Sequence, residues 1–518
     1  MKIRNKKYIK IFSILLFIVL GILILQGYAK KKLEGLIVEK IPQNYSLKYS
    51  DIDINIVLGN IALNNTSLKI KNKDTTQYHT DLKTESLELN GIGYWDLLFN
   101  EILTIKSLEL KNPKLLYYPY KKSVSKETDV KSNDDGIKTL NIKKIAITNG
   151  SVAVMRKSAD SIKMALSSYN LTILDSSLDL KSKEKMPVTY NSYELDAQEI
   201  VLDNNAFDKL KIDSVSANKE ELKITNFQII PKYGKKELSA HLKKERDYIK
   251  LNIPQIILKE FDFNLDKPRL AITATSGEIV KPNLEIYRDK LIADDLTIKP
   301  LYSKSLRNLS FDLKIDELKI KNGYISYAEL VDPDKKAGKL FFDEVDATIY
   351  EISNLKKAKK TEIKVISKLM GEAPLTLNWT FDVNNSADEF TVNGSVSNLN
   401  APVLNPFFQP NLNALAEGTL QQMYFNFYAN NTVSKGEMKM KYDDFNFKIL
   451  RKNSNKINKV LTTIGNIFIR KDSKEDPKDF RYGDIEAERD ATKSFFNYLW
   501  INVKSGVVST LTGNGKKE

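Results

Sequence analysis

Hydrophobic and polar residues alternate along much of the chain, and one arrangement of them occurs four times. In each copy, apolar residues stand four and two positions before an asparagine and return three positions after it. The asparagines are Asn112, Asn149, Asn226 and Asn322. Alternation with a period of two predicts β-strands that have one apolar face.

Each copy predicts a β-hairpin with the asparagine in its loop. Asn-Gly stands at 149–150 and 322–323, and also at 90–91 and 393–394, and this dipeptide is the strongest short hairpin signal. In such a hairpin the apolar residues on either side of the loop are cross-strand partners on one face. Pro113 and Phe227 replace the glycine in the other two copies, where a wider turn is expected.

The β pattern extends from about residue 45 to residue 450, which predicts one long β domain. Residues 30–44 are expected to form a short amphipathic helix and a linker that contains Pro42. Residues 451–518 are expected to be helical, because apolar residues keep helical spacing from Ile457 to Phe468 and from Ile485 to Val508. The apolar stripe of the last helix is Phe496, Leu499, Trp500, Val503 and Val507.

An amphipathic sheet has to hide its apolar face against a second sheet, against helices or against a partner that is not protein. The expected helices could cover only the ends of this sheet, and no linker divides the chain into sandwich-sized domains. These patterns favour a mainly β fold, an elongated and curved or twisted antiparallel sheet that forms a groove. The alternative is an ordinary core between two packed sheets.

The first 29 residues predict a membrane anchor. An uncharged, mostly apolar run extends from Ile11 to Ala29, and as a helix it would be about 28 Å long, close to the thickness of a bilayer's hydrocarbon core. Five basic residues precede the run and three follow it, which places the N-terminus in the cytoplasm and the body of the chain across the membrane. A cleaved signal peptide, with Gly27 and Ala29 near its cleavage site, is the alternative.

The amino-acid composition limits the kinds of site that the chain can form. The net charge of +14 comes from dispersed lysines, which suits solubility or an anionic membrane surface better than a nucleic-acid site. No cysteine is present, so disulfide and thiolate chemistry are excluded. His79 and His241 lie among polar residues and are expected to be exposed, and no phosphate loop or nucleophile motif occurs. We therefore expect neither an enzyme nor a cofactor or metal.

The last third of the chain resembles the AsmA-like family, relatives of TamB in Gram-negative envelopes. The N-terminal anchor, the amphipathic helix and the repeated Leu-x-Ile-x-Asn-Gly units are similar in arrangement to that family. The closest sequence similarity lies in residues 340–450 of the β domain and continues to about residue 510. The matching residues are Gly371 to Leu375, Trp379 to Asp382, Gly394, Leu404 to Phe407, Gly418, Gly436 to Met438, Tyr442 and Ser494 to Trp500.

This resemblance implies a protein of the inner membrane whose periplasmic β-groove binds phospholipid and contributes to lipid transport toward the outer membrane. It also implies a second possibility, an assembly factor for outer-membrane proteins that has a packed core and acts through envelope or periplasmic protein partners. For the C-terminal helix, Phe496, Tyr498 and Trp500 are candidates for a membrane interface, and a cap over the sheet's open edge is the equal alternative. The candidate groove residues are Leu108, Leu110, Ile145, Ile147, Val152, Val154, Leu222, Ile224, Ile229, Leu318, Ile320, Ile325 and Tyr327.

Overall fold

The computed structural model describes residues 26–31, 35, 44–71, 77–94, 100–119, 138–157, 159–182, 188–264, 269–450, 472–474 and 476–513. The chain is mainly β, with 62% strand and 13% helix, and contains a large sheet. Its contacts divide it into two compact units, residues 1–203 with 212–219, and residues 204–211 with 220–518. The sequence placed no boundary within the β domain.

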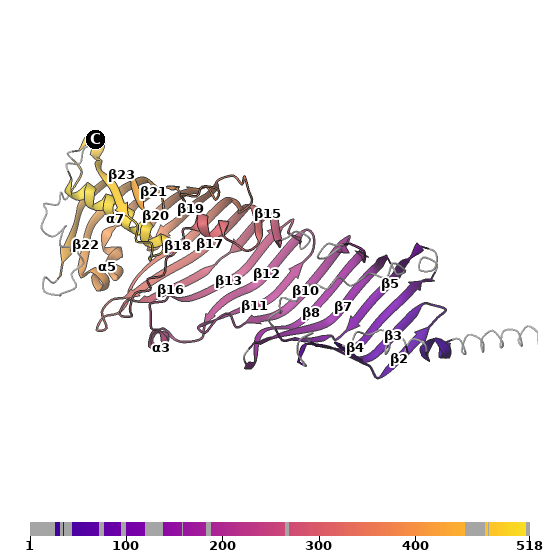
Figure 1. Cartoon of the computed structure of the whole chain (residues 1–518). Coiled ribbons are helices and arrows are strands. Elements are labelled where there is room, and N and C mark those ends of the chain that lie inside the picture. Colours follow the sequence, from indigo (N-terminus) through magenta and orange to yellow (C-terminus); the bar gives the residue numbers. More distant parts are fainter. Residues whose placement is uncertain are drawn as a thin grey trace, which may run out of the picture. The chain divides into compact units, whose positions relative to one another are not determined.

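The first unit is built from long strands that pair along the chain (Figure 1). Most pairs are antiparallel, as expected, but β7 runs parallel to both β5 and β6. The strands are β1 (Tyr45–Lys48), β2 (Asp51–Asn55), β3 (Asn60–Lys71), β4 (Tyr78–Gly93), β5 (Ile102–Lys111), β6 (Lys114–Tyr117), β7 (Thr139–Arg156), β8 (Ala159–Asp179), β9 (Val188–Thr189) and β10 (Ser192–Leu202), and β11 (Asp208–Ala217) has residues in both units.

The second unit continues with β strands and adds short helices. Its strands also pair mainly antiparallel, but β15 and β16 each run parallel to β17, so a purely antiparallel sheet is wrong for both units. The strands are β12 (Glu221–Pro231), β13 (Tyr248–Lys259), β14 (Asp262–Asn264), β15 (Ala271–Val280), β16 (Asn283–Asp289), β17 (Asp312–Leu330), β18 (Gly338–Ser353), β19 (Thr361–Leu369), β20 (Ala373–Phe381), β21 (Phe390–Asn400), β22 (Ala414–Ala429), β23 (Val433–Ile449) and β24 (Arg481–Glu488). The helices are α3 (Lys235–His241), α4 (Tyr302–Arg307), η1 (Ala401–Leu404), α5 (Asn405–Leu412), η2 (Pro477–Asp479) and α7 (Phe495–Thr512).

The four repeated asparagines do not form hairpin loops. Asn149, Asn226 and Asn322 lie inside the single strands β7, β12 and β17, and Asn112 separates β5 from β6, which continue beside β7. All four have a left-handed backbone, with φ between 50° and 53°. The pairing of β7 with β8 and of β17 with β18 shifts register at Gly150 and Gly323, as a β-bulge does.

The physical reason for this error is that hairpin loops and bulges demand the same residues. Asparagine adopts positive φ more readily than other residues that carry a side chain, and both structures use that property. The Asn-Gly pairs at 90–91 and 393–394 likewise lie inside strands, β4 and β21. At the four repeated asparagines and at Gly91 the local sequence identified where the backbone turns left-handed, although it could not tell a loop from a kink in a continuous strand. Asn393 and Gly394 have no left-handed backbone.

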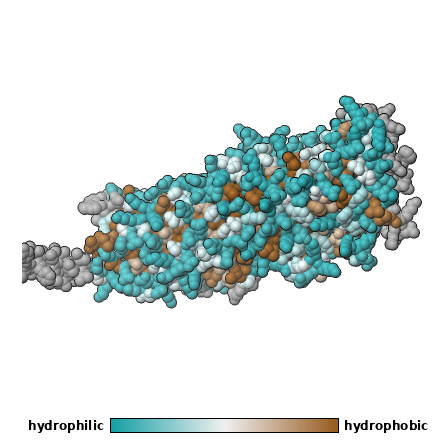
Figure 2. All heavy atoms as spheres, turned by 180° about the vertical axis from the view of Figure 1, so that it is seen from behind, coloured by the Kyte–Doolittle hydropathy of each residue, from teal (hydrophilic) through white to brown (hydrophobic). Residues whose placement is uncertain are grey.

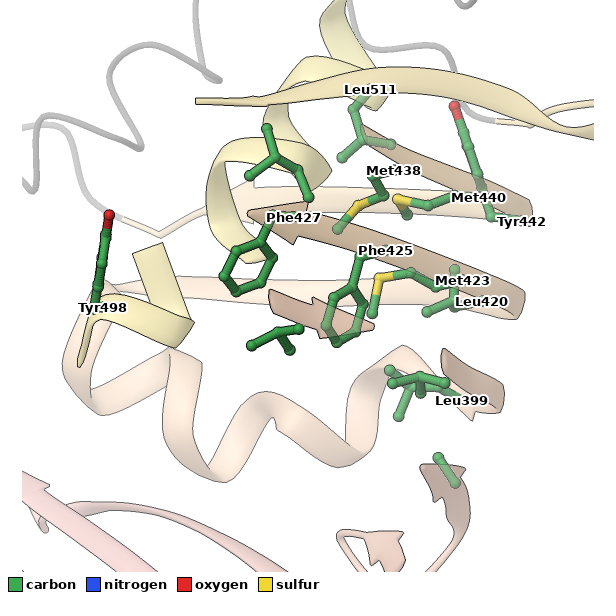
Figure 3. Close-up of a cluster of buried hydrophobic side chains, with 14 of the residues drawn as sticks. Leu399, Leu420, Met423, Phe425, Phe427, Met438, Met440, Tyr442, Tyr498 and Leu511 are labelled. Atoms are coloured by element: carbon green, nitrogen blue, oxygen red, sulfur yellow. The ribbon is translucent and has the colours of Figure 1, made fainter. Parts of the chain in front are cut away.

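A hydrophobic core lies in the C-terminal part of the second unit. Aromatic and methionine side chains of β22 and β23 pack together beneath α7, with Tyr498 entering from the helix (Figure 3). At the start of that helix, Phe495 stacks on Trp379 of β20 with ring centroids 4.2 Å apart. The hydroxyl of Ser494 accepts a hydrogen bond from the Asn497 amide and caps the helix.

The terminal predictions have mixed outcomes. Residues 485–488 belong to β24, and the last helix begins only at Phe495, so the expected helical start at Ile485 is wrong. Pairing with β23 holds this stretch extended, a tertiary effect that helical spacing does not reveal. The expected helix at 457–468 and most of residues 1–44 lie outside the described residues. No helix in the described part of the chain is both long and apolar enough to cross a membrane.

Candidate functional site

The repeated apolar residues of the first unit belong to rows that run across the strands. A row is a set of residues that face each other directly on successive strands and therefore share one face of the sheet. Ile147 and Ile145, two and four positions before Asn149, each lie in a row of seven apolar residues. The first row is Ile52, Leu63, Leu87, Leu110, Ile147, Leu171 and Leu195, and the second is Ile54, Ile61, Leu89, Leu108, Ile145, Ile173 and Tyr193.

Two further rows follow on the other side of the asparagine. Val152 belongs to the third row and Val154 to the fourth, on the same strand as Ile147 and Ile145. The third row is Leu47, Leu68, Leu82, Leu115, Val152, Leu166 and Ile200, and the fourth is Tyr45, Ile70, Thr80, Tyr117, Val154, Met164 and Leu202. Only Thr80 interrupts the apolar character.

The bulge keeps all four rows on one face. Ile147 and Val152 are five positions apart, and strict alternation would direct them to opposite faces. One inserted residue reverses the alternation, so the apolar side chains before and after it return to the same side. The sequence pattern predicts a shared face on a hairpin, and in the structure a single bulged strand forms that face.

The second unit repeats this arrangement around Asn226 and Asn322. Leu222 pairs with Leu258, and Leu318 with Ile349, in rows that continue toward the C-terminal strands. Gly277 lies between Leu258 and Leu318, whose methyl groups occupy the space that a Cβ would need. The rows are Leu222, Leu258, Gly277, Leu318, Ile349, Ile363, Trp379, Val392 and Phe427; Ile224, Ile256, Ile279, Ile320, Ala347, Val365 and Leu377; Ile229, Leu251, Leu284, Ile325, Phe342, Leu369 and Ala373; and Ile249, Ile286, Tyr327 and Leu340.

All thirteen candidate groove residues are half-buried, and none is fully buried or fully exposed. In the described part of the first unit, strands make extensive contacts only with strands to which they are hydrogen-bonded. Most row residues therefore have neighbours on both sides and remain half-exposed, whereas Ile52, Leu63 and Tyr193 are buried. No described strand outside the ladder packs on the rows, and Lys30, in the helical residues 26–31, binds Asp51 of β2. Hydrophobic surface lies in patches among hydrophilic side chains on the face that Figure 2 shows.

Burial rises along one row where a helix covers it. Leu318 and Ile349 are half-buried, whereas Val392 and Phe427 of the same row are 0% and 1% exposed. Helix α7 packs on β22, β23 and β24, and it covers this end of the row and accounts for its greater burial. A Cβ on its Gly506 would come within 2.7 Å of Met438 Cε, so this helix lies close to the sheet. The uncovered part of the face thus has the same kind of side chains as the covered part.

Charged and amide side chains occupy the opposite face. Lys111 binds Glu88 at 2.8 Å, and the pair lowers the pKa of the Glu88 carboxyl and raises that of the Lys111 ammonium. In the second unit, Lys319 binds Glu317 at 2.7 Å, which raises the pKa of the lysine. The sheet is therefore amphipathic, with water on one side and an apolar surface on the other.

The membrane-interface candidates on α7 separate into two groups. Phe496 and Trp500 are 62% and 42% exposed, so their rings are accessible. Tyr498 is 1% exposed and lies in the core, which makes its assignment to a membrane interface wrong. The stripe that the helix buries is Phe495, Tyr498, Asn502, Gly506 and Thr510, not the more apolar stripe of Phe496 and Trp500.

Other residues singled out by sequence have ordinary surroundings. His241 is exposed and packs on Tyr233, but His79 is half-buried, with its Nδ1 2.7 Å from the Thr80 hydroxyl. The Tyr327 hydroxyl donates to Glu329 at 2.9 Å, and burial raises the pKa of Tyr327. The repeat did not identify the row residues of β8, Leu166, Leu171 and Ile173, although the alternation of Leu171 and Ile173 was a usable signal.

No protein-family model matches the chain, and no curated protein matches its sequence. The resemblance to AsmA-like proteins therefore rests on the residues named in the sequence analysis.

Proposed function

We propose that the chain is a non-enzymatic, membrane-anchored protein that binds phospholipid acyl chains along its uncovered apolar rows. The observation that carries this proposal is the row architecture of the first unit, where rows of seven mainly apolar residues share one face, most of them half-exposed, and no second sheet among the described residues packs on them. A soluble surface seldom keeps so long an apolar stretch without a partner. Acyl chains are a partner that needs only shape and apolar contact.

The dimensions of the rows suit acyl chains. Strands lie about 4.8 Å apart, so a row across seven strands is about 29 Å long. One acyl chain occupies about half of a bilayer's hydrocarbon thickness, or about 15 Å, so one row matches about two chains placed end to end. Each methylene that leaves water contributes about 0.8 kcal/mol, which makes such binding favourable without any charged contact.

The wider proposal combines this surface with the N-terminal sequence. Residues 11–29 would anchor the chain in the inner membrane, with the N-terminus in the cytoplasm and the β domain in the periplasm. An elongated, curved groove would then conduct phospholipid toward the outer membrane and contribute to envelope homeostasis, as in the family that the chain resembles.

A structural or assembly role is the second candidate. Its support is the fully covered core beneath α7, where the same rows end in buried Val392, Phe427 and Ile485. If protein partners cover the remaining rows in the same way, the chain acts by binding envelope proteins. Crosslinking would then recover proteins and no lipid.

The two functions are separated by lipid analysis of the purified full chain and of single variants. Ile147→Asp and Ile320→Asp place a charge on the uncovered rows, and Thr148→Asp places it on an exposed site next to Ile147 on the other face. Under the lipid-binding proposal the first two variants fold but retain less phospholipid, and Thr148→Asp retains as much as the wild type. Under the packed-core alternative the row variants unfold, because an unpaired buried charge costs several kcal/mol. Well-folded wild-type protein that carries no lipid would contradict lipid binding.

A further inference from the structure

The polar face of the second unit holds a trough on the side of the sheet opposite the apolar rows. Strands β19 to β24 line it, and its volume is about 660 Å³. Its exposed lining residues alternate along the strands with residues that face the core: Val392 and Phe427 are buried, while Asn393 and Asn426 beside them are exposed. The exposed lining of the trough therefore lies on the face opposite the proposed lipid surface.

Two rows of polar side chains form the floor of this trough. Asn378, Asn393 and Asn426 face each other on β20, β21 and β22. Next to them runs a row of hydroxyl-bearing residues, Thr376, Ser395 and Tyr424, in the same register. The hydroxyls of Thr376 and Ser395 lie 2.7 Å apart, so together they offer a fixed donor and acceptor.

The asparagine row has unused hydrogen-bonding capacity. All three side chains are exposed, and among the described residues none of them makes a side-chain hydrogen bond within the protein. This differs from the asparagines of the first unit, where Asn149 donates to Asn112 and its backbone amide binds Asn170. Each free carboxamide can donate twice and accept twice, so the row presents parallel amide groups at about the strand spacing of 4.8 Å.

An aromatic side chain borders these amides. Tyr424 is 37% exposed, and the Lys439 ammonium lies 4.9 Å from its ring centroid, with Phe480 also in contact. These contacts hold the ring in place from the β23 side. Its neighbour on the other side is the small Ser395, which leaves space beside the ring over the trough.

The chemistry of the trough excludes other common ligands. The charged residues of its lining are Lys364, Lys439 and Glu437. Two positive charges and one negative charge are too little positive charge to bind a nucleic-acid backbone. Of its apolar lining residues, Ile366 is 64% exposed, whereas Phe425 and Met438 are buried and Val365 and Leu377 are half-buried, so the trough offers an acyl chain little exposed apolar surface. A peptide that adds a strand needs an open edge, whereas β20 to β23 are paired on both sides. On β24 the backbone amides of Asp484 and Glu486 already donate to Ser509 and Ser505 of α7.

We propose that this trough binds a linear oligosaccharide of N-acetylated sugars. An acetamido group and an asparagine carboxamide are matched donor–acceptor pairs, and sugar hydroxyls match the Thr376 and Ser395 row. The apolar C–H face of a sugar ring packs on the Tyr424 ring, as apolar groups do on aromatic surfaces. Lying across the strands, the oligosaccharide meets one amide on each of β20, β21 and β22.

The test is calorimetric titration of the full chain with the hexamer of β-1,4-linked N-acetylglucosamine, compared with the unacetylated glucose hexamer. Variants Asn393→Ala and Tyr424→Ala remove one amide and the ring. Tyr78→Ala is the matched control, because Tyr78 is also 37% exposed and, like Tyr424, has a lysine ammonium over its ring, but it belongs to the first unit. Asn393→Asp keeps the size of the side chain, removes its donors and adds a negative charge.

Saturable binding of the acetylated hexamer by the wild type is expected, with each trough variant weakening it about fivefold to tenfold and Tyr78→Ala leaving it unchanged. Absence of binding to the wild type would overturn the proposal. Equal binding of both hexamers, or equal weakening by Tyr78→Ala, would overturn it as well. Because the exposed substitutions leave the core intact, their melting temperatures should match the wild type. Lipid content is measured separately and does not affect this outcome.

Discussion

The side-chain amide of Asn149 donates a hydrogen bond to Oδ1 of Asn112 at 2.7 Å. These are two of the four repeated asparagines, and a hairpin at each would have left them in separate loops. Instead both lie at the same level of neighbouring parallel strands, where their left-handed backbones coincide. The repeat in the sequence therefore marks a seam that crosses the strands. Along this seam the strands are kinked while the apolar rows stay on one face.

The seam predicts a specific pattern of stability at position 149. Asn149→Gly loses the side-chain bond but tolerates positive φ, so the free energy of unfolding should fall by about 0.5–1 kcal/mol. Asn149→Ala also loses the side-chain bond and, unlike glycine, keeps a Cβ in the left-handed region. Its free energy of unfolding should fall by about 1–3 kcal/mol. Denaturant unfolding of the two variants measures the difference. If alanine and glycine were equally tolerated, the left-handed residue would not control the seam.

Two adjacent phenylalanines at the start of α7 predict opposite effects. Phe495 is 5% exposed and stacks on Trp379, whereas Phe496 is 62% exposed. Phe495→Ala should destabilise the unit by about 3–5 kcal/mol through lost packing and a cavity. Phe496→Ala should change stability by less than about 0.5 kcal/mol. Thermal unfolding followed by tryptophan fluorescence tests both, and similar losses for the two variants would contradict the placement of the helix.

A buried carboxylate predicts how stability depends on pH. Glu245 is 8% exposed, and burial opposes its ionisation, but the Lys290 ammonium at 2.7 Å and Lys493 at 3.3 Å outweigh burial and lower its pKa below the ordinary 4.5. A lowered folded-state pKa gives stability that is present above pH 4.5 and is lost as the pH falls through the folded value. Arg288 and Asp294 also face this cluster, Asp294 through Lys493.

Glu245→Gln provides the measurement for that prediction. The variant should be less stable than the wild type at neutral pH, and the gap should narrow as the pH falls below 4.5, because the wild type then loses the same charge. Unfolding at several pH values records the gap. Glu372→Gln, at an exposed turn, is the control and should follow the wild type throughout. A constant gap between Glu245→Gln and the wild type would contradict the assignment.

The sequence revealed the β class and the apolar face of these strands, because alternation reports side-chain direction directly. It could not reveal the parallel pairing of β7 with β5 and β6, since partner choice depends on contacts distant in the chain. It also misassigned Tyr498. Helix α7 is apolar on more than one side, so periodicity alone does not specify which stripe is buried. Phe495 and Tyr498, three positions apart, share the buried stripe with the small Gly506.

The polar trough was not visible in the sequence for a related reason. Asn378, Asn393 and Asn426 are separated along the chain, and each occupies an ordinary solvent-facing position in its strand. Only the register of β20, β21 and β22 places them side by side. Alternation predicts that such residues face water, but it does not predict which of them meet.

The most direct test of lipid binding is site-specific photocrosslinking in living cells. The photoreactive residue p-benzoylphenylalanine would replace Ile147, on the uncovered rows, and in a separate variant Thr148, on the opposite face. After irradiation, mass spectrometry of the purified chain identifies what is attached. If the uncovered rows bind lipid, a phospholipid adduct is expected at position 147 and none at position 148. Protein adducts alone at position 147, or equal lipid labelling at both positions, would contradict it.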